Sequence, residues 1–213
     1  MMELLAFGDT GWGDELLLSM VMTILVSTSS LAFGLIIGTI FASFKLSNSY
    51  ILKAIAEFYT TVVRGVPELL VIYLLFFGGS GAVMYVAKIF GHMGYIELSP
   101  FTIGTIAVGA ISGAYSTEVI RGAILAVPKG QFEAAQTLGM AKYAMSFKVI
   151  FPQVARLALP GIGNVWQVTL KDTALISVTG LVEIMRQSKI AAGSTHEPFI
   201  FYTVAIILYL FIT

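Results

Sequence analysis

The chain contains no cysteine among its 213 residues, and only 11% of them are charged. The missing cysteine excludes disulfides and thiolate chemistry. Twelve basic and twelve acidic residues give a formal net charge of zero, so the electrostatic signature of a nucleic-acid-binding protein is absent. Soluble domains carry roughly 25% charged residues. The shortage of charge therefore favours a membrane protein.

Catalytic and nucleotide-binding patterns are also missing. No GxxxxGK[ST] motif occurs, and the glycines at 78, 79 and 81 lack the lysine that a phosphate-binding loop needs. No nucleophile, histidine and acid group together in a plausible arrangement. His92 and His196 are too isolated for a metal site. We expect no enzyme activity, metal or cofactor in this chain, so a partner would have to bind any nucleotide.

Long apolar runs take up most of the sequence, which is 57% hydrophobic. A membrane helix needs about 20 apolar residues to cross roughly 30 Å. The predicted spans cover 16–44, 69–87, 98–120, 157–182 and the run from 198 onward. Residues 1–15 carry no basic residue, unlike a secretory signal, so we expect the first span to be retained. The last run reaches Thr213 without a basic anchor, which indicates a truncated C-terminal end.

Proline and glycine predict where these helices are disturbed. Pro67 should break a mixed segment at 51–68, because it removes a backbone donor and clashes with the preceding turn. Pro160 and the neighbouring glycines should break the fourth span. Small residues in the third span favour close packing inside a helix bundle. Residues 183–197 are predicted to form a loop. The sequence thus predicts one all-α membrane domain, residues 1–213, with about five transmembrane helices.

Basic residues indicate the orientation, since Lys and Arg accumulate in cytoplasmic loops. With the N-terminus outside, seven basic residues fall in inner segments and three in outer ones. The inner ones are Lys45, Lys53, Arg121, Lys129, Lys142, Lys148 and Arg156, and the outer ones are Lys88, Arg186 and Lys189. The sequence therefore predicts a periplasmic N-terminus and a cytoplasmic polar loop at about 126–156.

That polar loop contains EAAQTLGMAKYAMSFKVIFP, from Glu133 to Pro152. The pattern predicts a short helix stopped by Gly139, because glycine accepts the left-handed conformation that ends many helices. A second amphipathic helix should follow, with Pro152 beyond it. Two alanines leave a narrow strip on the first helix, so it could lie close to a partner's backbone.

The spacing from Glu133-Ala134-Ala135 through Gly139 to Val149 and Phe151-Pro152 resembles the EAA loop of bacterial ABC-importer permeases. The flanking text agrees: RGVPELL at 64–70, YSTEVIRGAILAVPKGQ at 115–131 and ALPGIGNVWQVTLKDTALISVTGLVEI at 158–184. Together these motifs resemble the polar amino acid permeases, and within them the importers of histidine and opines. Val149 and Phe151 replace the usual Ile and Leu, and both keep the apolar character.

The resemblance implies a type I importer permease fold in a bacterial inner membrane. It implies as partners a dimer of ATPase subunits that binds ATP and Mg, a second similar permease or another copy of this chain, and a periplasmic binding protein, with lipid but no nucleic acid. The transported substrate would be histidine, a basic amino acid or an opine. The EAA helix would seat in the ATPase, through Phe132, Glu133, Ala134, Ala135 and Gly139. The structural alternative is a cytoplasmic hairpin that only covers the bundle.

Charged and polar residues inside or beside the spans are candidates for the substrate pathway, since intramembrane charges are costly and often functional. These candidates are Arg64, Glu68, Glu118, Gln167, Lys171 and Asp172. Structural alternatives stay open for each. Lys171 and Asp172 are adjacent and do not face each other on a helix, so either could instead form an inter-helix salt bridge. Glu118 and Arg121 are spaced i, i+3 and could pair with each other.

Two other functional classes fit the sequence less well. An ATP-independent carrier or channel would not need an EAA loop, and carriers of this kind often show an inverted repeat that is not detectable here. A membrane scaffold without transport activity is disfavoured by the polar stripe Asn164, Gln167 and Lys171.

Overall fold

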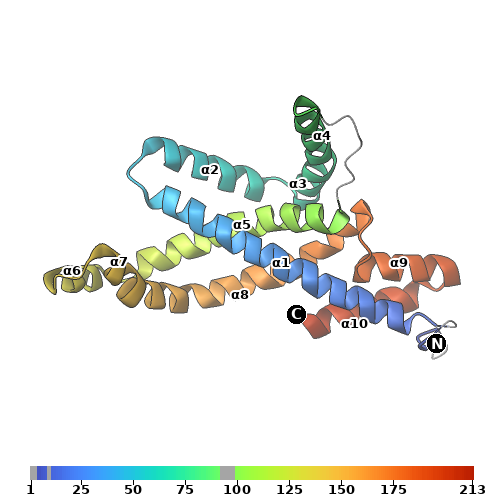
Figure 1. The fold of residues 1–213 in the computed structure, drawn as a ribbon. Coiled ribbons are helices and arrows are strands. Elements are labelled where there is room, and N and C mark those ends of the chain that lie inside the picture. Colours follow the sequence, from blue (N-terminus) through green and yellow to red (C-terminus); the bar gives the residue numbers. More distant parts are fainter. Residues whose placement is uncertain (1–3, 9–10, 92–98) are drawn as a thin grey trace.

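The computed structural model describes residues 4–8, 11–91 and 99–213, so His92 and most of the predicted loop 88–97 lie outside the described residues. Helices are the only regular secondary structure in these ranges, which confirms the all-α prediction (Figure 1). The α-helices are α1 Gly13–Leu46, α2 Tyr50–Gly65, α3 Glu68–Tyr73, α4 Gly79–Ile89, α5 Pro100–Ala126, α6 Lys129–Thr137, α7 Lys142–Met145, α8 Phe151–Ile176, α9 Ile184–Thr195 and α10 Pro198–Ile212. Two π-helical segments, η1 Leu74–Gly78 and η2 Ser146–Ile150, and the 3-10 turn η3 Ser177–Thr179 join some of them.

Among the described residues, three helical segments have the length and hydropathy to cross a membrane. They are α1, the continuous segment Glu68–Ile89 and α5. At 34 residues α1 is about 51 Å long, well beyond the hydrocarbon thickness of a bilayer. Helices α8 and α10 coincide with the fourth and fifth apolar runs; α8 carries more polar residues, and α10 is shorter. Their positions match the predicted runs, and the fourth and fifth spans stay predictions.

The centre of the bundle is the contact between α1 and α5, and small residues make it. A Cβ atom placed on Gly38 would lie 2.6 Å from the Ser116 Cβ, and one on Gly34 would lie 2.2 Å from the Ser112 Oγ. Glycine is therefore needed at both positions for the two backbones to approach this closely. Most of α5 is buried, which confirms the prediction that this span lies inside the bundle.

Prolines have different effects at different places. Pro67 has extended backbone angles and separates α2 from α3, as predicted. Pro160 lies inside α8 without ending it, so the predicted break of the fourth span is wrong. Membrane helices tolerate proline when neighbouring groups replace the lost contacts. Here Gly161 approaches Val119 of α5 so closely that an added Cβ would lie 2.6 Å from its Cγ1.

The segment 183–197, predicted to be a loop, is mostly the helix α9, so that prediction is wrong. The charged residues of this segment led to the prediction of a loop, but the helix also has an apolar face on which Ile184, Ala191 and Ala192 are buried. The predicted end of the helix before Pro152 is wrong as well, because α7, η2 and α8 run on without a break. The π-helical turn η2 ends at Ile150, two residues before Pro152, which has no N–H to donate.

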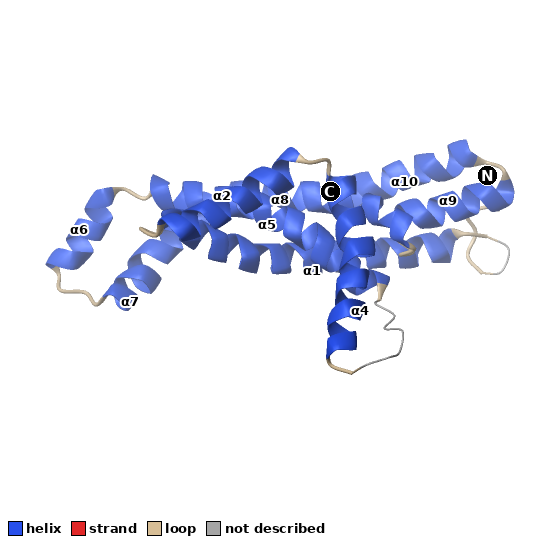
Figure 2. Cartoon of the chain, turned by 90° about the horizontal axis from the view of Figure 1, so that it is seen from above, coloured by secondary structure: helices blue, strands red, loops and turns tan. Residues whose placement is uncertain are grey.

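The molecule is elongated, and its two ends differ. Helices α6 and α7 form one tip, while the N-terminal segment and α9 lie at the other (Figure 1). The view from above shows the same arrangement, with α4 projecting sideways from the bundle (Figure 2). The EAA segment and the N-terminus therefore lie at opposite ends of the long helices.

Candidate functional site

The EAA segment ends its helix through a Schellman motif. Gly139 has φ of +68° and donates its N–H to the Gln136 carbonyl at 2.9 Å, while Met140 donates to the Ala135 carbonyl at 3.1 Å. Two carbonyls that α6 leaves unpaired are thereby satisfied. The left-handed angle is one that glycine adopts without a steric penalty. The predicted stop at Gly139 is therefore confirmed as a structural feature.

The two alanines of the segment differ in burial. Ala135 is 3% exposed and packs inward, whereas Ala134 and Glu133 are exposed. Phe132 is half-buried, and Leu138, at the end of the helix, is 80% exposed. The outward strip of α6 is therefore made by Glu133 and Ala134, with an apolar side chain at its end.

An aromatic ladder beside α6 was missed by the sequence reasoning. The rings of Tyr143 and Phe147 have centroids 4.5 Å apart, and those of Phe147 and Phe151 are 6.2 Å apart. All three side chains are exposed. Their spacing of four residues along one helix was the available signal. This tip therefore presents exposed aromatic surface next to the EAA helix.

A second cluster lies where α2, α3, α5 and α8 meet. The Arg64 guanidinium lies over the Tyr115 ring, 5.3 Å from its centroid, within the range of a cation–π contact. The Tyr115 hydroxyl donates to the Glu68 Oε1 at 3.3 Å. Asp172 is within electrostatic range of both Glu68 and Tyr115. Three of the six predicted pathway residues are thus gathered around Tyr115, which the sequence reasoning did not single out.

A cavity of about 240 Å³ opens beside this cluster. Its polar lining consists of Arg64, Tyr115, Glu118 and Asn164, and the apolar wall comes from α5 and α8. Small-molecule pockets usually measure roughly 300–1,000 Å³, so one chain supplies slightly less room than such a pocket needs. Both oxygens of Glu118 are already bound by basic residues of the chain, Lys45 and Arg121. The local pairing of Glu118 with Arg121 confirms the alternative that their spacing offered.

Lys171 and Gln167 lie apart from this cavity. Lys171 is exposed and lines a separate, mainly apolar groove between α8 and α10, with Tyr202 and Tyr209 among its neighbours. Gln167 is exposed on the surface of α8. The predicted polar stripe is therefore divided, because Asn164 faces the cavity while Lys171 faces the groove.

A helical membrane chain with an exposed helical tip at one end and charged residues around a cavity between its long helices has the character of a transport subunit. The family follows from comparison with known proteins. Residues 31–213 match the binding-protein-dependent transport system inner membrane component family, and the chain belongs to it. It is thus a membrane-embedded permease subunit, of a class whose members are not themselves enzymes. The resemblance stated from the motifs is confirmed.

Individual relatives agree over almost the whole chain. The nopaline transport system permease protein NocQ of Agrobacterium fabrum is 53% identical over 213 residues, which is 100% of this chain and 90% of that protein. The histidine/lysine/arginine/ornithine transport system permease protein HisQ of Escherichia coli is 42% identical, covering 95% of this chain and 89% of its own length. A crystal structure of an amino acid ABC transporter with histidines superposes with a TM-score of 0.78 at 31% identity, covering 94% of this chain and 88% of that one.

Proposed function

We propose that the chain is the permease subunit of an ATP-driven importer for polar amino acids or opines. The observation that carries this proposal is the EAA helix α6, turned by Gly139 at the tip opposite the N-terminus. A helix with an exposed strip of Glu133 and Ala134 beside exposed aromatic rings suits a rigid docking contact with a separate motor subunit. Movement of such a subunit could then be passed to the membrane helices.

The partners follow from this role. ATPase subunits would bind ATP and Mg and receive α6 on the cytoplasmic side. A periplasmic binding protein would deliver substrate near the N-terminal end, and a second permease or another copy of this chain would complete the pathway. The cavity beside Arg64 is smaller than a usual small-molecule pocket, which supports a contribution from that second subunit.

The names of the relatives and the charges around the cavity favour the same substrate class. Relatives are named as transporters of nopaline, octopine and basic amino acids. Arg64 offers a guanidinium for a substrate carboxylate, while Glu68 and Asp172 offer carboxylates for an ammonium or other basic group. The arrangement suits a zwitterionic substrate with an additional basic group. Lys171 and Gln167 would contact substrate only if the second subunit brings the groove of α8 and α10 to the pathway.

The test is purification of the chain from membranes together with the other subunits of its transport system. We expect an ATPase to be retained, and we expect reconstituted vesicles to take up nopaline, octopine, arginine or histidine only when ATP and the binding protein are supplied. Gly139→Ala forces a side chain into the left-handed region at a cost of about 1–2 kcal/mol and should release the ATPase or uncouple hydrolysis from uptake. Glu133→Ala should act in the same direction.

Gly130→Ala is the matched control, because Gly130 lies in the same helix without a positive φ and has open space around it. It should leave retention of the ATPase unchanged. Uptake that continues without any ATPase would instead identify an ATP-independent carrier, and the proposed function would be wrong.

A further inference from the structure

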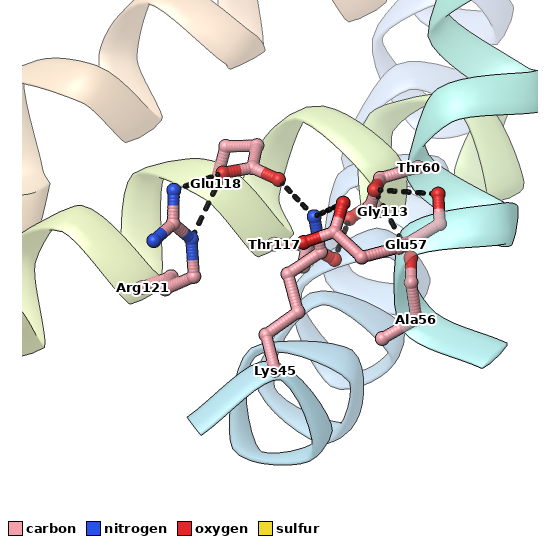
Figure 3. A network of polar contacts seen from close by, with 8 residues as sticks. All are labelled: Lys45, Ala56, Glu57, Thr60, Gly113, Thr117, Glu118 and Arg121. Atoms are coloured by element: carbon pink, nitrogen blue, oxygen red, sulfur yellow. Dashed lines mark hydrogen bonds and ion pairs between the residues drawn. The ribbon is translucent and has the colours of Figure 1, made fainter. Parts of the chain in front are cut away.

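Four charged residues form a network near the C-terminal ends of α1 and α5 and the middle of α2, which we call the Lys45 network. The Lys45 Nζ donates to the Glu118 Oε1 at 2.5 Å and to the Glu57 Oε2 at 3.0 Å. Arg121 donates from Nε and Nη2 to the Glu118 Oε2, at 3.0 and 2.9 Å (Figure 3). The network joins two residues of α5 to one residue each of α1 and α2.

The centre of the network is shielded from water. The Lys45 side chain is only 5% exposed, and the Glu118 side chain is 24% exposed, whereas Glu57 is largely in solvent. Desolvation offsets much of the attraction in a buried ion pair, so such a pair is weak evidence for added stability. What the pair of Lys45 and Glu118 does supply is a directional link between two helices, with a large penalty if one partner is lost.

Other contacts reinforce the same three helices. The Tyr59 hydroxyl of α2 donates to the Ala110 carbonyl of α5 at 2.5 Å, and Gly38 of α1 packs directly on Ser116 of α5. Within the part of the chain that the structure describes, no side-chain hydrogen bond or ion pair joins α8 to α1, α2 or α5. The contact of Gly161 with Val119 is apolar. Direct polar links therefore join α1, α2 and α5 to one another, whereas α8 packs on α5 through an apolar contact. A polar connection of α8 to α1 runs through α10, whose Tyr209 hydroxyl lies within reach of Thr173 and Thr23.

The network is also close in sequence to the EAA helix. Arg121 is five residues before the end of α5 at Ala126, and α6 begins at Lys129 after a two-residue connection. At the same time Glu118 lines the cavity, together with Arg64 of α2. The network therefore lies between the docking tip and the cavity wall.

We propose that Lys45, Glu118 and Arg121 are positioning residues that make α1, α2 and α5 move as one unit when α6 is displaced. The cavity wall formed by Arg64 and Tyr115 then shifts as a whole against the wall formed by α8. This inference rests on the proposed function and assigns the network a role in coupling and not in substrate recognition, since both oxygens of Glu118 are bound by Lys45 and Arg121. The network stays closed throughout the transport cycle.

The first experiment measures substrate uptake per ATP hydrolysed, using the complete complex in proteoliposomes. Lys45→Met and Glu118→Gln should each lower this ratio about tenfold while hydrolysis continues, which is a typical size for a lost coupling between sites. Lys53→Met is the matched control, because Lys53 is an exposed lysine of α2 that has no ion-pair partner among the described residues. Full coupling in both network variants would overturn the proposal.

The second experiment uses the absence of native cysteine. A double variant, Lys45→Cys with Glu118→Cys, should be uncoupled, and a bifunctional thiol reagent that bridges the two cysteines should restore uptake per ATP. Each single cysteine variant, treated in the same way, should not recover. Loss of the remaining uptake on bridging would show that the network must open during the cycle, and the proposal would be wrong.

Two further readouts distinguish a loss of coupling from a loss of folding. The first is assembly with the ATPase together with the melting temperature, because a variant that only unfolds would lose the one and lower the other. The second is Lys45→Arg, which keeps the charge and should preserve both assembly and coupling. If Lys45→Arg assembles normally but is uncoupled, charge pairing is not the cause and the proposal fails. If the unchanged complex shows no ATP-driven uptake, the proposed function itself fails, whatever the variants do.

Discussion

Glu183 is the most buried charged side chain among the described residues, with none of its surface exposed. It lies between α8 and α9 and caps α9, accepting hydrogen bonds from the Met185 and Arg186 N–H groups at 2.9 and 2.7 Å. The Tyr209 hydroxyl of α10 donates to it at 2.7 Å. Burial raises the pKa of the Glu183 carboxyl, and these hydrogen bonds oppose that shift. One side chain therefore fixes both the start of α9 and its position on α10.

Replacing Glu183 with alanine should lower the stability of the protein by about 2–4 kcal/mol. The change removes a helix cap and leaves two backbone N–H groups and a buried hydroxyl unpaired. Glu197→Ala is the control, because Glu197 holds the equivalent position before α10, is exposed and makes no capping hydrogen bond. Thermal melting in detergent measures the difference. Equal melting temperatures for the two variants would contradict the capping role.

Residues that act through local spacing could be predicted from the sequence. Gly139 followed from its place after a helical pattern, and the pairing of Glu118 with Arg121 followed from one helical turn. The bond of Lys45 to Glu118 could not be predicted, since 73 residues separate the two. Tyr115 was missed for the same reason, because its neighbours Arg64 and Glu68 come from α2 and α3. A single sequence contains no signal for such distant pairs.

Helices α1 and α5 show how one pair of elements organises the bundle. Lipid supplies no hydrophobic drive for association, so membrane helices depend on close packing. Gly34 and Gly38 of α1 meet Ser112 and Ser116 of α5, at matching intervals of four residues. The two helices therefore touch along one row of small residues. Beyond this row, toward the C-terminal ends of both helices, Lys45 of α1 pairs with Glu118 of α5.

A single methyl group at Gly38 should separate these helices. Gly38→Ala places a Cβ 2.6 Å from the Ser116 Cβ and 3.2 Å from the Thr117 nitrogen, so the backbone must shift. We expect a loss of about 1–3 kcal/mol, the usual range for overpacking. Gly122→Ala, on α5 with open space around it, should instead be neutral or stabilising by up to about 1 kcal/mol. Melting temperature and membrane yield should fall for Gly38→Ala and stay equal or rise for Gly122→Ala.

The length of an apolar run predicted the helices reliably, whereas prolines and charged residues did not predict where helices end. The spans beginning near residues 16, 69 and 98 correspond to helices because nothing in them competes with a helix. Pro160 was expected to break α8, yet the neighbouring α5 supports the helix there through Val119. Helix α9 was predicted to be a loop because its charges concealed the residues that pack on α1 and α10. Tertiary contacts decided each of these cases.

The long helices of the molecule hold the EAA helix and the N-terminal segment at opposite ends. The EAA helix and the turn from α1 to α2 lie at one end, and the N-terminal segment and α9 lie at the other (Figure 1). The excess of basic residues in the segments near the first end predicts that this end is cytoplasmic. Coupling to a cytoplasmic ATPase requires this orientation, so the topology can be tested independently of transport.

Single cysteines provide that test, because the natural chain gives no background labelling. Phe7→Cys, at a position 69% exposed, should react with a membrane-impermeant maleimide in intact spheroplasts. Leu138→Cys, 80% exposed at the end of α6, should react only after the membrane is broken, in cells that lack the ATPase. Tyr50→Cys, between α1 and α2 and outside the docking tip, should behave like Leu138→Cys. Labelling of Leu138→Cys from outside would put α6 beyond the reach of any cytoplasmic motor, and the coupling role of the EAA helix would have to be abandoned.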